Sequence, residues 1–262
     1  MKKTMKQMAF TLAETLIVMG VIGVVAALTI PSLSNSTNDK DVVAKVRKNY
    51  SALEDAFGRM IGTYGEFDSW GATLATEDLG KRLFSSMKLT KDCGITVNKD
   101  CFANNSTMLK SDGADLSSNV NAQNAYKVLL ADGASVAVNV DNSTCTANVG
   151  ANVSQDLKEV CGTILVDIDG PSKGKGMHGL DLFQFLITKK GVFPVGTEAD
   201  EKFKYNDDCT KKGAPTTVAG SKGCTAWVVY NANLDYKKAN TSGQCLSNTG
   251  KTLNFSNTTS CD

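Results

Sequence analysis

Residues 9–31 read AFTLAETLIVMGVIGVVAALTIP, and this stretch decides the architecture that the sequence predicts. No residue in 16–30 is charged, and Glu14 is the only ionisable side chain between Phe10 and Pro31. Because a helix of about 20 apolar residues crosses a bilayer, the sequence predicts a membrane-spanning helix here. A carboxylate inside such a helix is costly, so Glu14 is a candidate functional residue.

The start of this stretch resembles the N-terminal signature of the type IV pilin family, which includes the pseudopilins of type II secretion. The resemblance is carried by Phe10, Thr11, Leu12, Glu14, the uncharged run to Ile30, and Pro31. In that family a dedicated prepilin peptidase cleaves just before the Phe and methylates the new amine. The resemblance therefore implies cleavage between Ala9 and Phe10, with Ala9 standing where the family usually has glycine.

The same resemblance implies an assembly role for Glu14. In the family this acid lies close to the free amine of a neighbouring subunit's first residue, which here is Phe10. Two opposite charges in a medium of low dielectric attract each other far more strongly than in water. The alternative is that Glu14 lies near the membrane surface and has no role.

Two other kinds of N-terminal segment fit the sequence less well. An ordinary secretory signal has its apolar core before the cleavage site, whereas here the core follows the cut expected at Ala9. A plain single-pass anchor explains the apolar run but not the pattern Phe-Thr-Leu-x-Glu. The pilin-like interpretation explains both.

The implied organisation is a class III leader over residues 1–9, a transmembrane and assembly helix over 10–31, a continuation of that helix over 32–65, and an exported globular head over 66–262. Pro31 lacks a backbone donor and predicts a kink or soft point. The implied location is the bacterial inner membrane, single-pass, with the head in the periplasm or outside the cell. The implied partners are other pilin-like subunits, the prepilin peptidase, the inner-membrane assembly platform and membrane lipid.

The eight cysteines all follow the apolar stretch, and none forms a CxxC pair. Zinc sites need closely spaced thiols, so disulfides in an oxidising compartment are the better interpretation. The sequence leaves many connectivities open. The simplest pairs nearest neighbours: Cys93–Cys101, Cys145–Cys161, Cys209–Cys224 and Cys245–Cys261.

Apolar residues at helical spacing continue beyond the first stretch. The repeat comprises Val43, Val46, Tyr50, Leu53, Phe57 and Met60, and it predicts a helix packed on its own sheet. Gly62 and Gly65 are expected to end this helix. A short helix is expected over residues 76–87, with Thr76 as its N-terminal cap.

The remaining pattern indicates antiparallel strands, so the predicted fold class is α+β: a long N-terminal membrane-spanning helix on a small antiparallel sheet with disulfide-stapled loops, as in pilins. The expected strands cover residues 126–130, 135–140, 163–168, 182–188 and 192–195. Residues 225–230 fit either a strand or a helical turn. Residues 93–124 are polar and are expected to form a long loop.

Clustered acids follow the third of these strands, at Asp167 and Asp169, with Asp181 nearby. A similar Asp-x-Asn/Asp-Gly turn occurs in many secretion pseudopilins. Carboxylates and loop carbonyls are the ligands that Ca²⁺ prefers, so these residues are candidate calcium ligands. Asp and Gly also form ordinary turns, and that alternative stays open.

No convincing catalytic set is present, and we expect no enzymatic activity. His178 is the only histidine, so a Ser-His-Asp or Cys-His arrangement would have to use it. It lies in a glycine-rich loop and is expected to be a surface residue. The formal net charge of +1 argues against a nucleic-acid partner.

Two functions remain. The first is a structural subunit of a type II secretion pseudopilus or a type IV pilus-like filament, assembling through the N-terminal apolar helix. The second is a minor, tip-located pilin that acts as an adhesin or binding module through the loops at 93–124 and 197–262. Abundance in sheared filaments would separate them.

Overall fold

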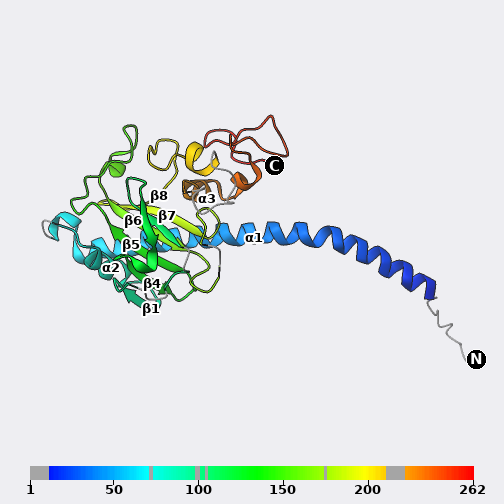
Figure 1. Cartoon of the computed structure of the whole chain (residues 1–262), viewed down its shortest axis with the longest axis horizontal. Coiled ribbons are helices and arrows are strands. Elements are labelled where there is room, and N and C mark those ends of the chain that lie inside the picture. The colour runs from blue at the N-terminus through cyan, green and yellow to red at the C-terminus, as the bar shows by residue number, and fades with distance from the viewer. Residues whose placement is uncertain (1–11, 71–72, 98–100, 104–105, 174–175, 211–221) are drawn as a thin grey trace, which may run out of the picture. The chain divides into compact units, whose positions relative to one another are not determined.

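The computed structural model describes residues 12–70, 73–97, 101–103, 106–173, 176–210 and 222–262 (Figure 1). The chain divides into two compact units, Met1–Asp41 and Val42–Asp262. Helix α1 (Leu12–Tyr64) contributes residues to both. The expected boundaries at residues 9, 31 and 65 remain predictions, since the leader lies outside the described residues.

In the first unit, α1 carries apolar side chains that are largely exposed, such as Leu16 at 65% and Met19 at 73%. No helix in the described part of the chain is both long and apolar enough to cross a membrane. The predicted membrane-spanning helix and the single-pass inner-membrane location are therefore wrong. A bilayer needs about 20 predominantly apolar residues in a helix, and no described helix combines that length with sufficient apolar character.

In the second unit, the predicted apolar stripe of α1 is confirmed. Val46, Leu53 and Met60 are at most 1% exposed and belong to the main hydrophobic core. Tyr50 stacks on Phe185 of the sheet, with ring centroids 5.5 Å apart. The stripe therefore fixes α1 on one face of the sheet.

The end of α1 is set by one of the two glycines expected to end it. Gly62 lies inside the helix, which ends at Tyr64. Gly65 follows with a φ of +81°, and its N–H donates to the carbonyl of Ile61 at 2.9 Å. A left-handed residue at this position is a common helix end, and glycine adopts it without strain.

The sheet has six antiparallel strands in the order β1-β4-β5-β6-β7-β8 (Figure 1). Their bounds are β1 (Leu89–Gly94), β4 (Tyr126–Leu130), β5 (Ser135–Val140), β6 (Val160–Asp167), β7 (Leu182–Thr188) and β8 (Val192–Pro194). The five predicted strands are confirmed, with small differences at their ends. Strand β6 begins three residues before the predicted start and ends one residue before the predicted end, and β8 ends one residue before its predicted end. The α+β class and the antiparallel sheet are therefore confirmed without a membrane-spanning helix.

Alternation along the strands gives the sheet two apolar faces. Val136 and Val138 of β5 belong to the core beneath α1. Ala137, between them, belongs to a second core cluster with Phe102 and Met108. The sheet is therefore covered on both sides, by α1 on one and by the segment after β1 on the other.

Residues 93–124 do not form the long loop that was expected. They contain the end of β1, the hairpin β2 (Thr107–Leu109) and β3 (Asp115–Asn119), and the short helix η2 (Val120–Ala122). The backbone of Leu109 is held by the side chain of Gln184, which accepts from its N–H at 3.1 Å and donates to its carbonyl at 3.0 Å. Residues 93–124 are mostly polar, but apolar side chains such as Phe102 and Met108 and these hydrogen bonds hold the segment against the sheet.

The shorter helices differ in detail from the prediction. Helix α2 (Thr76–Phe84) ends three residues before the expected Met87, and its cap is Ala75. Thr76 is the first residue of the helix rather than its cap, and its hydroxyl accepts a hydrogen bond from the N–H of Val140 at 3.1 Å. Residues 225–230 are helical, within α3 (Thr225–Asn231). The remaining short helical segments are η1 (Phe67–Ser69), η3 (Gln155–Lys158), η4 (Tyr205–Thr210) and η5 (Asp235–Lys238).

All eight cysteines form disulfides, and the nearest-neighbour pairing is confirmed. The bonds are Cys93–Cys101, Cys145–Cys161, Cys209–Cys224 and Cys245–Cys261. Each bond joins cysteines that are 8 to 16 residues apart in the sequence. The prediction of disulfide-stapled loops is therefore confirmed.

Candidate functional site

The expected processing site, Ala9 and Phe10, lies outside the described residues. Glu14 lies in the first turn of α1, where the partial positive charge of a helix N-terminus favours a carboxylate. Its side chain is exposed. Its expected pairing with the amine of a neighbouring Phe10 stays a prediction.

The most distinctive surface is the exposed apolar segment of α1, which we define as residues 12–25. Its large apolar side chains are each between 54% and 81% exposed: Leu12, Leu16, Ile17, Val18, Met19, Val21, Ile22, Val24 and Val25. Soluble monomers rarely expose contiguous apolar surface on this scale, and such patches mark interaction sites.

Two glycines within this segment leave room for a close neighbour. A Cβ added at Gly20 or Gly23 would meet no atom within 4 Å. Small residues at helix surfaces let a second helix approach closely and gain van der Waals contact. The segment is therefore suited to packing against another helix.

The three candidate calcium ligands have other partners in the structure. Asp167 is buried and accepts hydrogen bonds from the N–H groups of Asp169 and Gly170, at 3.1 and 3.0 Å. Asp181 accepts from the N–H groups of Gly176 and Met177, at 2.8 and 2.6 Å. Among the described residues, no group of three or more His, Cys, Asp or Glu is arranged to hold a metal ion. The carboxylates support turns, and the structure gives no support to the calcium site.

Asp169 has a different role from the other two acids. Its carboxylate lies 3.1 Å from the Lys45 ammonium of α1. This ion pair links the turn after β6 to the helix across 124 residues of sequence. Asp169 therefore connects the sheet to α1.

Burial raises the pKa of the Asp167 carboxyl to about 7. The hydrogen bonds from Asp169 and Gly170 act against this shift, while the negative charges of Asp181 and Asp169 add to it. Asp167 therefore exchanges its proton near neutral pH, far above the ordinary range of an aspartate.

His178 is not the surface residue that was expected. It is 1% exposed, and its Nε2 lies 3.0 Å from the carbonyl oxygen of Thr107 in β2. The histidine helps to seat the β2–β3 hairpin. Because all cysteines are in disulfides, no Cys-His pair is formed.

Lys127 is a buried cation that sequence reasoning missed. It is fully buried in β4, and its ammonium donates to the carbonyls of Gln123 and Ala125, at 2.7 and 2.8 Å. Burial lowers its pKa to about 8. The available signal was strand alternation, which places Lys127 on the same face as buried Ala125 and half-buried Leu129.

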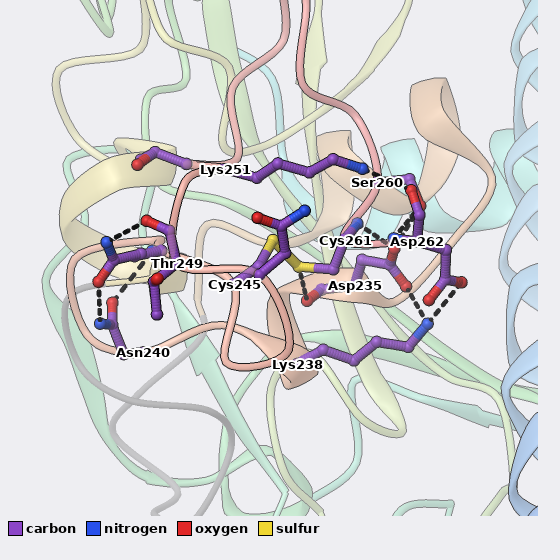
Figure 2. The surroundings of a disulfide bond; sticks show 12 residues. Asp235, Lys238, Asn240, Cys245, Thr249, Lys251, Ser260, Cys261 and Asp262 are labelled. Atoms are coloured by element: carbon purple, nitrogen blue, oxygen red, sulfur yellow. Dashed lines mark hydrogen bonds and ion pairs between the residues drawn. A yellow bond between two sulfur atoms is a disulfide. The ribbon is translucent and has the colours of Figure 1, made fainter.

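The C-terminal disulfide loop is built around Asp235 (Figure 2). One oxygen of this buried carboxylate accepts from Ser260 and Cys261, at 2.7 and 2.8 Å, and the other pairs with Lys238 at 2.9 Å. Lys238 also pairs with Asp262 at 2.9 Å. Burial acts to raise the pKa of Asp235, but these bonds, with those from Lys238 and Ser260 foremost, lower it below its ordinary value.

An open groove of about 390 Å³ lies between α1 and the β7–β8 turn. Phe57, Ile61 and Val192 supply apolar lining, and Lys189 and Lys190 stand at one wall. Both lysines form ion pairs, with Asp68 at 2.6 Å and Glu66 at 3.6 Å. Both lysine charges at the wall of this surface groove are therefore paired.

No family model, curated protein or solved structure matches the chain.

Proposed function

We propose that this chain is a structural subunit of a filament, either a type II secretion pseudopilus or a type IV pilus-like fibre, that assembles through α1. The single observation that carries the proposal is the exposed apolar segment of α1, residues 12–25. A helix that is apolar all round is stable only when something covers it. Copies of the same helix supply such a cover in a repeating assembly.

The energetics favour such packing. Fully burying one Val, Leu, Ile or Met side chain contributes about 1.5–3 kcal/mol. The segment presents many such side chains at more than half exposure, so even partial burial against neighbouring copies outweighs the freedom lost on association. Gly20 and Gly23 allow the close approach that this packing needs.

Glu14 is the one carboxylate of the segment. Covering the segment removes water from Glu14, and a desolvated carboxylate needs a partner. The resemblance of residues 9–31 to prepilins supplies one: the amine of Phe10 on the next copy, freed and methylated by a prepilin peptidase. The partners proposed are therefore other copies, that peptidase and an assembly platform.

The disulfides and the covered sheet of the second unit also support the proposal. Its four disulfides and its sheet, covered on both faces, make a rigid body suited to repetition along a fibre. The alternative, a scarce tip protein that binds a ligand, differs in abundance. A major subunit dominates sheared filaments, whereas a tip protein is a trace component.

The test compares two carboxylate variants of the full chain in the cells that make it. Glu14→Ala should abolish recovery of the protein in sheared, pelleted filaments, while Asp55→Ala, another exposed acid of α1, should leave recovery unchanged. Intact mass of the pelleted wild-type protein should show a chain that begins at a methylated Phe10. Equal recovery of both variants, or an unprocessed chain in the filaments, would contradict the proposal.

A further inference from the structure

The groove between α1 and the β7–β8 turn has an apolar floor and one charge that the protein does not balance. The apolar residues of its lining are Phe57, Ile61 and Val192. The two lysines at its wall are each paired with an acid. Glu54 also lines the groove, and it takes part in none of the ion pairs found in the described part of the chain. The groove therefore carries a net negative charge, which is located at Glu54.

The surroundings of Glu54 suit a cation that comes from outside the protein. No residue three or four positions away from Glu54 on α1 is charged. The Tyr50 hydroxyl is hydrogen-bonded to the Glu54 carboxylate, and Tyr230 of α3 lies close enough to interact electrostatically with both. Tyr230 is 56% exposed. A carboxylate beside an exposed aromatic ring attracts an ammonium or guanidinium group, because the ring face also favours a cation.

Gly58 keeps the floor of the groove open. It lies inside α1, where glycine is less favourable than alanine. A Cβ added at Gly58 would meet no atom within 4 Å, so the fold itself gives no packing reason for glycine. The absent side chain leaves space along the helix for a group from a partner. The groove volume of about 390 Å³ falls within the range of ligand pockets, about 300–1,000 Å³.

The spacing of these features along α1 fits an extended peptide. Glu54 and Gly58 are four positions apart on the helix, which corresponds to a rise of about 6 Å. In an extended chain, side chains on the same face are two residues apart, at about 6.6 Å. A peptide with a basic residue and an apolar residue separated by one residue therefore places the first at Glu54 and the second at Gly58.

We propose that this groove binds an extended segment of a partner polypeptide with the pattern basic–x–apolar. The Lys or Arg of the segment contacts the Glu54 carboxylate and the exposed ring of Tyr230. The apolar side chain two residues later covers Gly58 and packs on Ile61. All residues that line the groove belong to the second unit, so this binding goes beyond assembly through the apolar segment of α1 and does not depend on it.

The experiment is an NMR titration of the full-length protein, in mild detergent that covers the apolar segment of α1, with capped tripeptides. Acetyl-Arg-Ser-Leu-amide should shift the Gly58 amide and Tyr230 ring signals. Acetyl-Glu-Ser-Leu-amide should bind about fivefold more weakly, because it lacks the cation. Acetyl-Arg-Leu-Ser-amide should also bind more weakly, because its two anchors point to opposite faces. A control peptide that binds as tightly as the first, or the absence of a saturable shift at Gly58, would overturn the proposal.

Two pairs of variants locate the bound peptide. Glu54→Gln should weaken binding of the first peptide about three- to fivefold, whereas Asp55→Asn, at an exposed acid outside the lining, should leave it unchanged. Gly58→Leu should abolish binding by filling the groove, whereas Gly62→Leu should keep it, since Gly62 lies outside the lining. Both glycines have room for a Cβ, so a loss confined to Gly58→Leu is not a failure to fold. Unchanged binding in Glu54→Gln or in Gly58→Leu would place the peptide elsewhere and contradict the proposal.

Discussion

Lys45 of α1 and Asp169 of the turn after β6 lie 3.1 Å apart, and this ion pair joins the helix to the sheet. The side chains are 39% and 32% exposed, so water and salt screen the attraction. The hydrophobic stripe of α1 also packs against the sheet. The two kinds of contact should differ strongly in what they add to stability.

The first prediction compares these contributions. Lys45→Ala should lower the free energy of unfolding by no more than about 1 kcal/mol, as is typical of exposed pairs. Leu53→Ala should lower it by about 2–5 kcal/mol, because it leaves a cavity in the core; Leu53 is fully buried. Urea unfolding of the two variants measures both values. Equal losses would contradict this, because they would mean that the ion pair contributes as much as the buried stripe.

The second prediction concerns two helical glycines with opposite surroundings. A Cβ at Gly80 of α2 would overlap with the Tyr126 ring, whereas one at Gly58 of α1 would meet nothing within 4 Å. Gly80→Ala should therefore destabilise the protein by about 1–3 kcal/mol through overpacking. Gly58→Ala should stabilise it by about 0.5–1 kcal/mol, since alanine is the better helix former. Thermal unfolding distinguishes the signs, and a stabilised Gly80→Ala would contradict the packing of α2.

The third prediction follows from the buried ammonium of Lys127. Its pKa is lowered from 10.5 to about 8 in the folded protein, so between these values the unfolded chain binds more protons. The free energy of unfolding should then rise with pH above 8, by up to about 1.4 kcal/mol per pH unit.

Lys127→Met supplies the control for this effect. The variant has no ammonium at this position, so the rise between pH 8 and about 9.5, below the range in which tyrosines ionise, should disappear. Urea unfolding at several pH values measures the difference between the two slopes. Parallel slopes for wild type and variant would show that Lys127 keeps its ordinary pKa.

The features predicted correctly from the sequence are those that depend on local pattern. Cysteine pairing followed sequence order because each pair closes a short loop, as at Cys245–Cys261. The stripe from Val43 to Met60 was visible because helical spacing repeats within a few residues. The β4–β5 and β7–β8 hairpins were visible because their turns contain glycine at a suitable position, as at Gly133, whose φ is +93°.

The features that were missed depend on distant contacts. Thr76 is a residue type that often caps helices, but its hydroxyl instead accepts a hydrogen bond from the N–H of Val140, which is 64 residues away in the sequence. His178 lies in a glycine-rich loop, yet it is covered by the β2–β3 hairpin, which the sequence had presented as a polar loop. The membrane-spanning prediction was based on the uncharged stretch of sequence alone, and no helix in the described part of the chain is both long and apolar enough to cross a membrane.

The most direct test of the central claim is cross-linking between copies in the assembled full-length protein. Because every native cysteine is in a disulfide, Val21→Cys introduces a single free thiol in the exposed apolar segment, and Asp55→Cys introduces one at an exposed position outside it. Mild oxidation followed by non-reducing gel electrophoresis should give covalent dimers of the Val21→Cys protein and far fewer of Asp55→Cys. Only monomers from Val21→Cys, or equal dimer yields from the two variants, would contradict assembly through α1.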